Sequence, residues 1–193
     1  AGYARHASWP DLVGIGSSTG GVEALMAVLS TFPADCPPTL IVQHLPAAFT
    51  SSFCARLDKI CKATVVEGAN GAELQRGHVY VAPGAQHMTL VGKGAGQRLK
   101  LSQEDPVNGH RPSVDMLFES LAETFTGKMT GIILTGMGRD GAQGLLRMRE
   151  RGARTMAQDE ATSLVYGMPR VAYEIGAAER RVPLAQVVRE TFA

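Results

Sequence analysis

Residues 12–43 read LVGIGSSTGGVEALMAVLSTFPADCPPTLIVQ, and the expected fold class follows from the pattern of this segment. A short apolar run, Leu12–Ile15, is followed by a Gly/Ser/Thr-rich turn at 16–21, after which apolar residues recur at helical spacing up to Phe32. Thr39–Gln43 is a second apolar run of strand length. A strand, a turn, a helix and a second strand in this order predict parallel strands joined by a right-handed crossover.

The rest of the chain continues this alternation, with one interruption. Short alternating runs at 79–82, 88–91 and 98–101 are separated by glycines, which favours a small antiparallel excursion. We therefore expect one α/β domain at 12–193, with a mostly parallel, doubly wound sheet flanked by helices. The other expected elements are a helix marked by Phe49, Phe53, Leu57 and Ile60, a strand at 63–67, a helix marked by Val114, Leu117, Phe118, Leu121 and Phe125, a strand at 130–134, a helix ending near Gly152, a strand at 154–158, a helical stretch past Pro169 and a last helix near 184–192.

The composition is that of an ordinary globular domain. The 193 residues are 45% hydrophobic and 19% charged, which excludes disorder and fibrous structure. A formal net charge of +1 provides no general electrostatic footprint for nucleic acid or an anionic membrane, and no apolar run approaches the length of a membrane span. Glycine is the outlier, with 22 residues that lie mostly between the periodic segments, so the chemistry is to be sought in these loops.

The first residues and the cysteines of the chain indicate the cellular compartment of the protein. Residues 1–11 have no apolar core of the kind that a signal peptide needs, and we interpret them as the end of a linker. The three cysteines, Cys36, Cys54 and Cys61, are odd in number and do not have zinc-ligand spacing. We therefore expect a protein of the reducing cytoplasm.

Three polar side chains come immediately after predicted strands. Ser18 follows the first strand, His44 the second and Asp140 the strand at 130–134. Because ligands bind at the carboxyl ends of the strands in open α/β sheets, we expect these side chains at one edge. A serine hydroxyl becomes a good nucleophile when a histidine takes its proton, and a carboxylate on the other imidazole nitrogen orients the ring. The pattern thus predicts a catalytic triad of Ser18, His44 and Asp140.

The turn at 16–20 supports this hypothesis. Gly16-Ser17-Ser18-Thr19-Gly20 matches G-x-S-x-G, a tight strand-to-helix turn that presents a serine hydroxyl. The helix that begins near Gly21 directs backbone N–H groups and a partial positive charge toward this turn.

Each of these features also has an interpretation without catalysis. A turn rich in Gly, Ser and Thr is typical of phosphate cradles, although Thr19 replaces the third glycine of G-x-G-x-x-G and no Walker lysine follows. His44 precedes a proline turn, where a histidine is often structural, and Asp140 fits the N-cap of a helix beginning at Ala142. These three interpretations would all have to hold at one sheet edge, and this coincidence favours the triad.

The other histidines are weaker candidates for the base. His78 and His87 flank the antiparallel excursion, and we expect structural or cleft positions for them. His110 lies beside Arg111 in a Pro-rich loop and follows no strand. The sequence has neither H-E-x-x-H nor paired-cysteine spacing, so we expect no catalytic metal and no cofactor.

Four motifs occur in an order that resembles one known family. They are IGSSTGG at 15–21, QHLP at 43–46, HRPSVD at 110–115 and LTGMGRDG at 134–141, with shorter matches at 80–84 (YVAPG), 87–88 (HM) and 167–169 (GMP). The set resembles the catalytic domain of the bacterial chemotaxis protein-glutamate methylesterase, the CheB family. The likeness runs from about Leu12 to the C-terminus.

This resemblance implies a reaction and a site. It implies hydrolysis of γ-glutamyl methyl esters on chemoreceptor cytoplasmic helices with release of methanol, together with deamidation of receptor glutamines. It places the catalytic serine at Ser18, the histidine at His44 and the aspartate at Asp140, the residues already chosen from the strand ends. It also implies that Thr19 and the loop around Met137 shape the oxyanion site. The implied partners are methylated receptor helices and, in the full-length protein, an N-terminal receiver domain.

The sequence departs from the family pattern at two points. Ser17 stands where many members have Ala, so the choice of Ser18 as nucleophile depends on motif alignment. A receiver domain, whose phosphorylation relieves inhibition of the esterase in the family, is absent from this chain, and we expect an excised catalytic domain or a stand-alone relative. Two other classes of function remain: a nucleotide- or phosphate-binding module at 17–21, and a catalytically silent receptor-binding domain.

Overall fold

The chain forms one main sheet of seven parallel strands. The computed structural model describes residues 8–193, so residues 1–7 of the expected linker lie outside the described part. The strand order is β3-β4-β2-β1-β7-β8-β9, and every neighbouring pair is parallel. This confirms the expected fold class. The strands are β1 (Leu12–Ser17), β2 (Thr39–Gln43), β3 (Thr64–Glu67), β4 (His78–Val81), β7 (Met129–Ile133), β8 (Arg154–Gln158) and β9 (Arg180–Val182).

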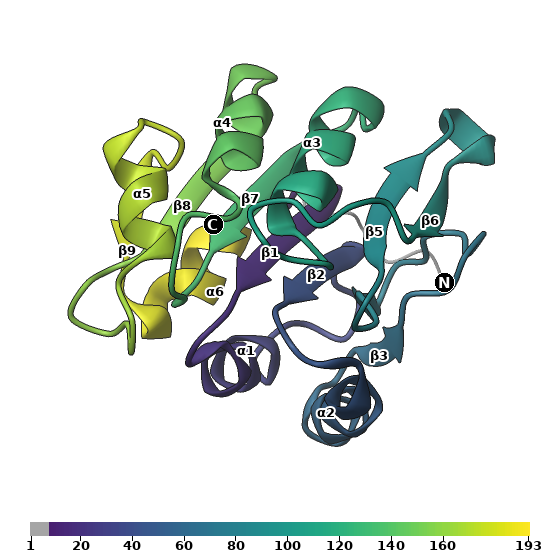
Figure 1. Ribbon diagram of the computed structural model, residues 1–193, viewed down its shortest axis with the longest axis horizontal. Helices are drawn as coiled ribbons and strands as arrows, with labels where there is room; N and C mark the ends of the chain where they lie inside the picture. The colour runs from purple at the N-terminus through teal and green to yellow at the C-terminus, as the bar shows by residue number, and fades with distance from the viewer. Residues whose placement is uncertain (1–7) are drawn as a thin grey trace.

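Helices cover both faces of this sheet (Figure 1). One face carries α3 (Val114–Thr124), α4 (Ala142–Glu150) and α5 (Met168–Glu174), and the other carries α1 (Gly21–Leu29), α2 (Ala47–Ile60) and α6 (Val187–Phe192). Each face has its own core, centred on side chains such as Phe118 in the first and Phe32 in the second. All residues of β1, β2 and β7 are buried, which explains why these strands are apolar runs without alternation.

The antiparallel excursion is a hairpin of two strands. β5 (His87–Val91) pairs antiparallel with β6 (Arg98–Ser102), and the short 3-10 turn η1 (Gly94–Gly96) lies between them. Met88, Leu90 and Leu99 are buried in the same core as α3. Two of the three runs expected in the excursion are thereby confirmed.

The expectation that residues 79–82 belong to this excursion is wrong. Residues 78–81 form β4, which lies between β2 and β3 and is parallel to both. Val79, Tyr80 and Val81 are all buried, so the strand is covered on both faces. The sequence does not predict β9, because three residues of which two are exposed show no hydrophobic periodicity.

Two helices differ in detail from the sequence-based expectation. The spacing predicts Phe49 and Ile60 on the inner face of α2, but their side chains are 57% and 42% exposed. Thr50 and Cys54 are buried there instead, beside Phe53 and Leu57. The expected last helix is divided into the 3-10 turn η2 (Leu184–Gln186) and α6.

The packing of α3 on β1 brings the start of this helix close to the end of the strand. A Cβ atom on Gly16 would lie 2.3 Å from Cγ1 of Val114, so only glycine permits α3 to begin this close to the end of β1. β1 pairs with β2 on one side and β7 on the other, so the loops that follow these three strands meet at one edge. Between residues 8 and 193, no helix combines the length and the apolar character that a membrane span requires.

Candidate active site

The loops after β2 and β7 bring a histidine and an aspartate into contact. His44 Nε2 lies 2.7 Å from Asp140 Oδ2, with the Asp140 side chain fully buried and that of His44 9% exposed. An ionised carboxylate only accepts hydrogen bonds, so the geometry assigns the proton of the imidazole to Nε2. Two of the three residues predicted for the triad are therefore direct neighbours.

Five hydrogen bonds converge on the Asp140 carboxylate. Burial by itself would raise the pKa of this group, but the hydrogen bonds from His44 and from the other donors outweigh burial and lower the pKa to about 2. Asp140 is therefore ionised at neutral pH and fixed in direction. The donors besides His44 are Ser113 Oγ (2.8 Å), Asn108 Nδ2 (3.0 Å) and the backbone amides of Val114 (2.7 Å) and Asp115 (3.1 Å).

Asp140 does not cap the helix that follows it. The N-cap of α4 is Gly141, and no side chain forms a capping hydrogen bond there, so the interpretation of Asp140 as the cap before Ala142 is wrong. The carboxylate instead accepts from the first two backbone amides of α3, at Val114 and Asp115. It thus lies at the positive end of that helix dipole, which stabilises its charge.

The structure distinguishes the two neighbouring serines. Ser17 is the last residue of β1; its side chain is fully buried, and its hydroxyl donates to Oε1 of Gln43. Ser18 comes after the strand and is partly exposed, with its backbone amide held by the carbonyl oxygen of Thr135 at 3.0 Å. Of the two hydroxyls, only that of Ser18 is open to a substrate.

The second nitrogen of His44 is available for catalysis. His44 Nδ1 is buried and has no hydrogen-bond partner within residues 8–193, and Ser18 Oγ is not bonded to it. Because Nε2 carries the proton toward Asp140, Nδ1 carries the lone pair and can accept a proton. The two nitrogens are oriented in the reverse sense to the chymotrypsin triad, where Nδ1 faces the aspartate. Catalytic hydrogen bonds often tighten only once a substrate is bound.

Thr19 and Met137 lie on loops that meet beside Ser18. A Cβ atom on Gly136 would be 2.9 Å from Cβ of Ser18, so the loop carrying Met137 passes directly against the serine. Thr135 Oγ1 donates to the carbonyl oxygen of Thr19 at 3.0 Å and ties the two loops together. In the described part of the chain, the backbone amides of Thr19 and Met137 form no hydrogen bond, and Met137 is 64% exposed. Both amides are free to donate to a substrate oxygen.

The remaining histidines occupy different environments. His110 stacks on His44, with ring centroids 3.7 Å apart and an angle of 10° between the rings. His87 is fully buried; its Nε2 lies 2.9 Å from the carbonyl oxygen of Asp105, and its Nδ1 accepts from the backbone amide of Ser113. His78 stacks on Tyr80 at the start of β4. His78 and His87 are structural, and His110 belongs to the site.

Sequence reasoning missed three residues around Asp140. Ser113, the N-cap of α3, and Asn108 both donate to its carboxylate. Asp115 is a second buried carboxylate, whose pKa is raised chiefly by burial; it accepts from the backbone amide of Gly144 and from Asn108, both at 2.7 Å. The sequence does contain local signals, a serine before an amphipathic helix and an Asn-Gly turn at 108–109, but these signals do not reveal the partner across space.

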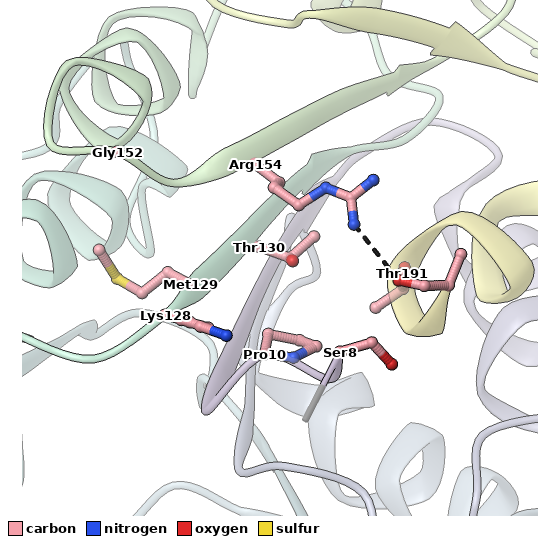
Figure 2. Close-up of a pocket in the computed structure, with 9 residues that line it drawn as sticks. Ser8, Pro10, Lys128, Met129, Thr130, Gly152, Arg154 and Thr191 are labelled. Carbon is pink, nitrogen blue, oxygen red and sulfur yellow. Dashed lines mark hydrogen bonds between the residues drawn. The ribbon is translucent and has the colours of Figure 1, made fainter. Parts of the chain in front are cut away.

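Two hollows lie near opposite edges of the sheet. A groove of about 300 Å³ at the carboxyl edge is lined by His44, Pro46, His110 and Arg111, among others. A larger cavity of about 400 Å³ lies at the amino edge, between the starts of β7 and β8 and α6 (Figure 2). The side chain of Arg154 reaches across it and donates to the carbonyl oxygen of Ala193 at 3.4 Å. Of these two hollows, the smaller groove is the one lined by a residue of the predicted triad, His44.

A parallel α/β sheet with a serine, a histidine and a buried carboxylate at its carboxyl edge is typical of serine hydrolases. Comparison with known proteins narrows this class to one family. The family model for CheB methylesterase matches residues 13–191, and the chain belongs to this family.

Relatives and a solved structure agree with this assignment. A protein-glutamate methylesterase/protein-glutamine glutaminase of Caulobacter vibrioides is 60% identical over 92% of this chain and 52% of its own length. Its counterpart in Agrobacterium fabrum is 57% identical over 93% of this chain and 51% of its own length. The crystal structure of the Thermotoga maritima CheB methylesterase catalytic domain has a TM-score of 0.90 and 36% identity, covering 94% of this chain and 96% of that one. The chain thus spans about half the length of the curated relatives it matches.

Proposed function

We propose that this chain hydrolyses methyl esters of glutamate side chains in chemoreceptors, with Ser18 as the nucleophile, His44 as the general base and Asp140 as the carboxylate that orients His44. The observation that carries this proposal is the buried 2.7 Å contact between His44 and Asp140. The residue before His44, Gln43, donates from Nε2 to the carbonyl oxygen of the partly exposed Ser18 at 2.8 Å. The family and the names of the relatives support the choice of ester. The same names support a second reaction, the deamidation of glutamine side chains.

Acylation depends on which nitrogen of His44 carries the proton. Nδ1 takes the proton of the Ser18 hydroxyl while the oxygen attacks the ester carbonyl, and the negative charge of Asp140 stabilises the imidazolium. The tetrahedral intermediate then collapses, the bond to the methoxy oxygen breaks, and His44 gives its proton to the leaving group as methanol. A glutamine substrate would release ammonia in the same step.

Deacylation uses the same residues in the reverse order. His44 Nδ1 removes a proton from a water molecule, the resulting hydroxide attacks the glutamyl ester of Ser18, and the proton returns to the serine oxygen. In both steps, the carbonyl oxygen gains negative charge. We assign its stabilisation to the backbone amides of Thr19 and Met137, each worth on the order of 3 kcal/mol or 10²–10³-fold in rate.

We further propose a cytoplasmic setting in which a receiver domain belongs to the full-length protein. The three cysteines are unpaired, which suits a reducing compartment. The twofold greater length of the relatives leaves room for a second domain of ordinary size. The substrate is then a receptor segment presented on the cytoplasmic side of the membrane.

Methanol release from methylated chemoreceptor fragments tests the reaction. The wild-type chain should release methanol, and Ser18→Ala should release less than a few per cent of the wild-type amount while keeping its melting temperature. Ser52→Ala is the matched control, because it removes an exposed hydroxyl on α2 that bonds only to the carbonyl oxygen of Phe49. Full activity in Ser18→Ala would show that the nucleophile is assigned wrongly.

The other two classes of function give different results in the same samples. A phosphate- or nucleotide-binding module would bind mononucleotides at equilibrium, and the esterase proposal expects no such binding. A silent receptor-binding domain would retain receptor fragments in a pull-down without releasing methanol. Either result, obtained with folded wild-type chain, would contradict the proposal.

A further inference from the structure

One short turn contacts both members of the His44–Asp140 pair. Val107 and His110 close this turn by two backbone hydrogen bonds, of 3.0 Å from the amide of Val107 and 2.9 Å from that of His110. Asn108 and Gly109 at its tip both have positive φ, of 55° and 79°. This conformation directs the side chains of residues 108 and 110 toward the site, one to each member of the pair.

Asn108 acts on the carboxylate. Its Nδ2 donates one hydrogen to Oδ1 of Asp140 at 3.0 Å and the other to Oδ2 of Asp115 at 2.7 Å. Both hydrogens of the amide are therefore used, and each goes to a buried carboxylate. Because Asp115 also accepts from the backbone of α4, the amide of Asn108 connects Asp140 to a fixed point in the fold.

His110 acts on the imidazole. Its ring covers one face of His44 at a centroid distance of 3.7 Å and is parallel to it within 10°. Burial lowers the pKa of His110, and the neighbouring His44 lowers it further, against the opposing effect of Asp140. A neutral His110 can stay against His44 when His44 becomes positively charged during the reaction. At this distance the His110 ring opposes tilting of the His44 ring toward it.

We propose that the turn at 107–110 is the positioning element of this site, with His110 fixing the plane of the His44 ring and Asn108 fixing the Asp140 carboxylate, so that Nδ1 faces Ser18. The inference rests on the proposed function, because it assigns a task within that reaction. Neither residue touches the reacting atoms in this account. Both act through the pair that they hold.

Two substitutions at His110 test whether its aromatic ring face or its imidazole nitrogens are needed. His110→Phe keeps an aromatic face of similar size, whereas His110→Leu fills a similar volume without one. We expect kcat of His110→Phe to stay within about threefold of wild type and kcat of His110→Leu to fall by about 10-fold to 100-fold, the range known for small misplacements of catalytic groups. KM should be unchanged in both, because the proposal gives His110 a contact with the His44 ring and none with the substrate.

A control histidine keeps this comparison specific. His78 also stacks on an aromatic ring, Tyr80, but lies at the start of β4 away from the site. His78→Leu should leave kcat and KM at the wild-type values. A rise in KM with unchanged kcat in His110→Leu would overturn the proposal, because it would make His110 a substrate contact. Equal losses of kcat in the Phe and Leu variants would overturn it as well.

Substitution of Asn108 by glycine tests the other half of the turn. Asn108→Gly suits the positive φ at this position and removes only the side-chain amide. We expect a fall in kcat of about 10-fold with an unchanged KM. An unchanged kcat would show that the contact with Asp140 is dispensable and would contradict the proposal.

Proton NMR of the free protein provides a readout that needs no substrate. The proton between His44 Nε2 and Asp140 should give a far-downfield resonance, identified by its loss in His44→Ala. This resonance should persist in His110→Phe and broaden by exchange with water in His110→Leu and Asn108→Gly. If wild type releases no methanol but the resonance behaves in this way, the proposed function fails while the positioning role stands. A resonance equally sharp in all three variants would refute the positioning role.

Discussion

At the scale of single residues, Asp140 performs two tasks with one carboxylate. It orients His44, and it accepts from the first amides of α3 together with the side chains of Ser113 and Asn108. Loss of its charge should therefore affect stability as well as activity. A lower melting temperature in Asp140→Asn would not by itself argue against a catalytic role.

The pH dependence of stability should reveal the charge of Asp140. Its pKa is lowered from 3.8 to about 2 in the folded chain, and this difference corresponds to about 2 kcal/mol of stability. Because the folded pKa is the lower one, this contribution is fully present above about pH 5 and is lost as the pH falls through 3.8 toward 2.

Urea unfolding of wild type and Asp140→Asn between pH 7 and pH 2 measures this contribution. The wild type should be the more stable protein at pH 7, and the difference between the two should shrink by about 2 kcal/mol on acidification. A difference that stays constant over this range would show that folding does not lower the pKa of Asp140.

The sequence allows candidate site residues to be chosen where they follow strands, but not where they lie in other loops or at helix starts. Ser18 and His44 come directly after β1 and β2, and Asp140 lies in the loop between β7 and α4, so the sheet places all three at one edge. Asn108, His110 and Ser113 lie in a loop and at a helix start. Asp140 is 32 residues from Asn108 and 27 from Ser113, and the partner of His110 is His44 in the loop after β2. No spacing rule connects such positions.

At the scale of elements, the N-terminus of α3 is the support of the site. Ser113 caps this helix by accepting from the amide of Met116, and the same hydroxyl donates to Asp140. His87, at the start of the β5–β6 hairpin, accepts from the amide of Ser113. The hairpin, the helix and the carboxylate are thus connected by direct hydrogen bonds.

Ser113→Ala should lose the cap and one donor to Asp140 together. We expect a loss of about 1–2 kcal/mol, which corresponds to a melting temperature about 2–8 °C lower for a chain of this size. Ser30→Ala is the matched control, since Ser30 is a helix-end serine whose hydroxyl donates only to Ala27 at an exposed position. Calorimetry of both variants checks this, and equal effects would contradict the role given to Ser113.

The sequence pattern is insufficient to predict two of the strands, β4 and β9. β4 looks like a member of the hairpin by its position in the sequence, yet it belongs to the main sheet. In the sequence, β4 is far from β2 and is separated from β3 by a loop. Only the burial of both its faces distinguishes it from a hairpin strand. β9 pairs with β8 over three residues, too few for any periodicity.

At the scale of the whole molecule, the three thiols report on the integrity of the fold rather than on the chemistry. Burial raises the pKa of Cys36 to about 11, that of Cys54 to about 12 and that of Cys61 to about 11. All three lie on the α1–α2 side of the sheet, away from His44 and Asp140.

These thiols should react slowly while the chain is folded. At pH 7.5, less than about 0.1% of each would be thiolate, the reactive form. Incubation with iodoacetamide followed by intact mass should show little labelling in native buffer and three additions in urea, with methanol release unchanged before unfolding. Rapid native labelling accompanied by loss of activity would place a cysteine in the reaction and contradict the mechanism.

A comparison of the two adjacent serines tests the identity of the nucleophile. Methanol release from methylated receptor fragments is measured for Ser18→Ala and Ser17→Ala, each corrected for its folded fraction. Ser18→Ala should be inactive, because it lacks the nucleophile. Ser17→Ala, which loses only a buried hydrogen bond to Gln43, should keep most of its activity. Activity that survives in Ser18→Ala and disappears in folded Ser17→Ala would assign the nucleophile to Ser17 and exclude Ser18.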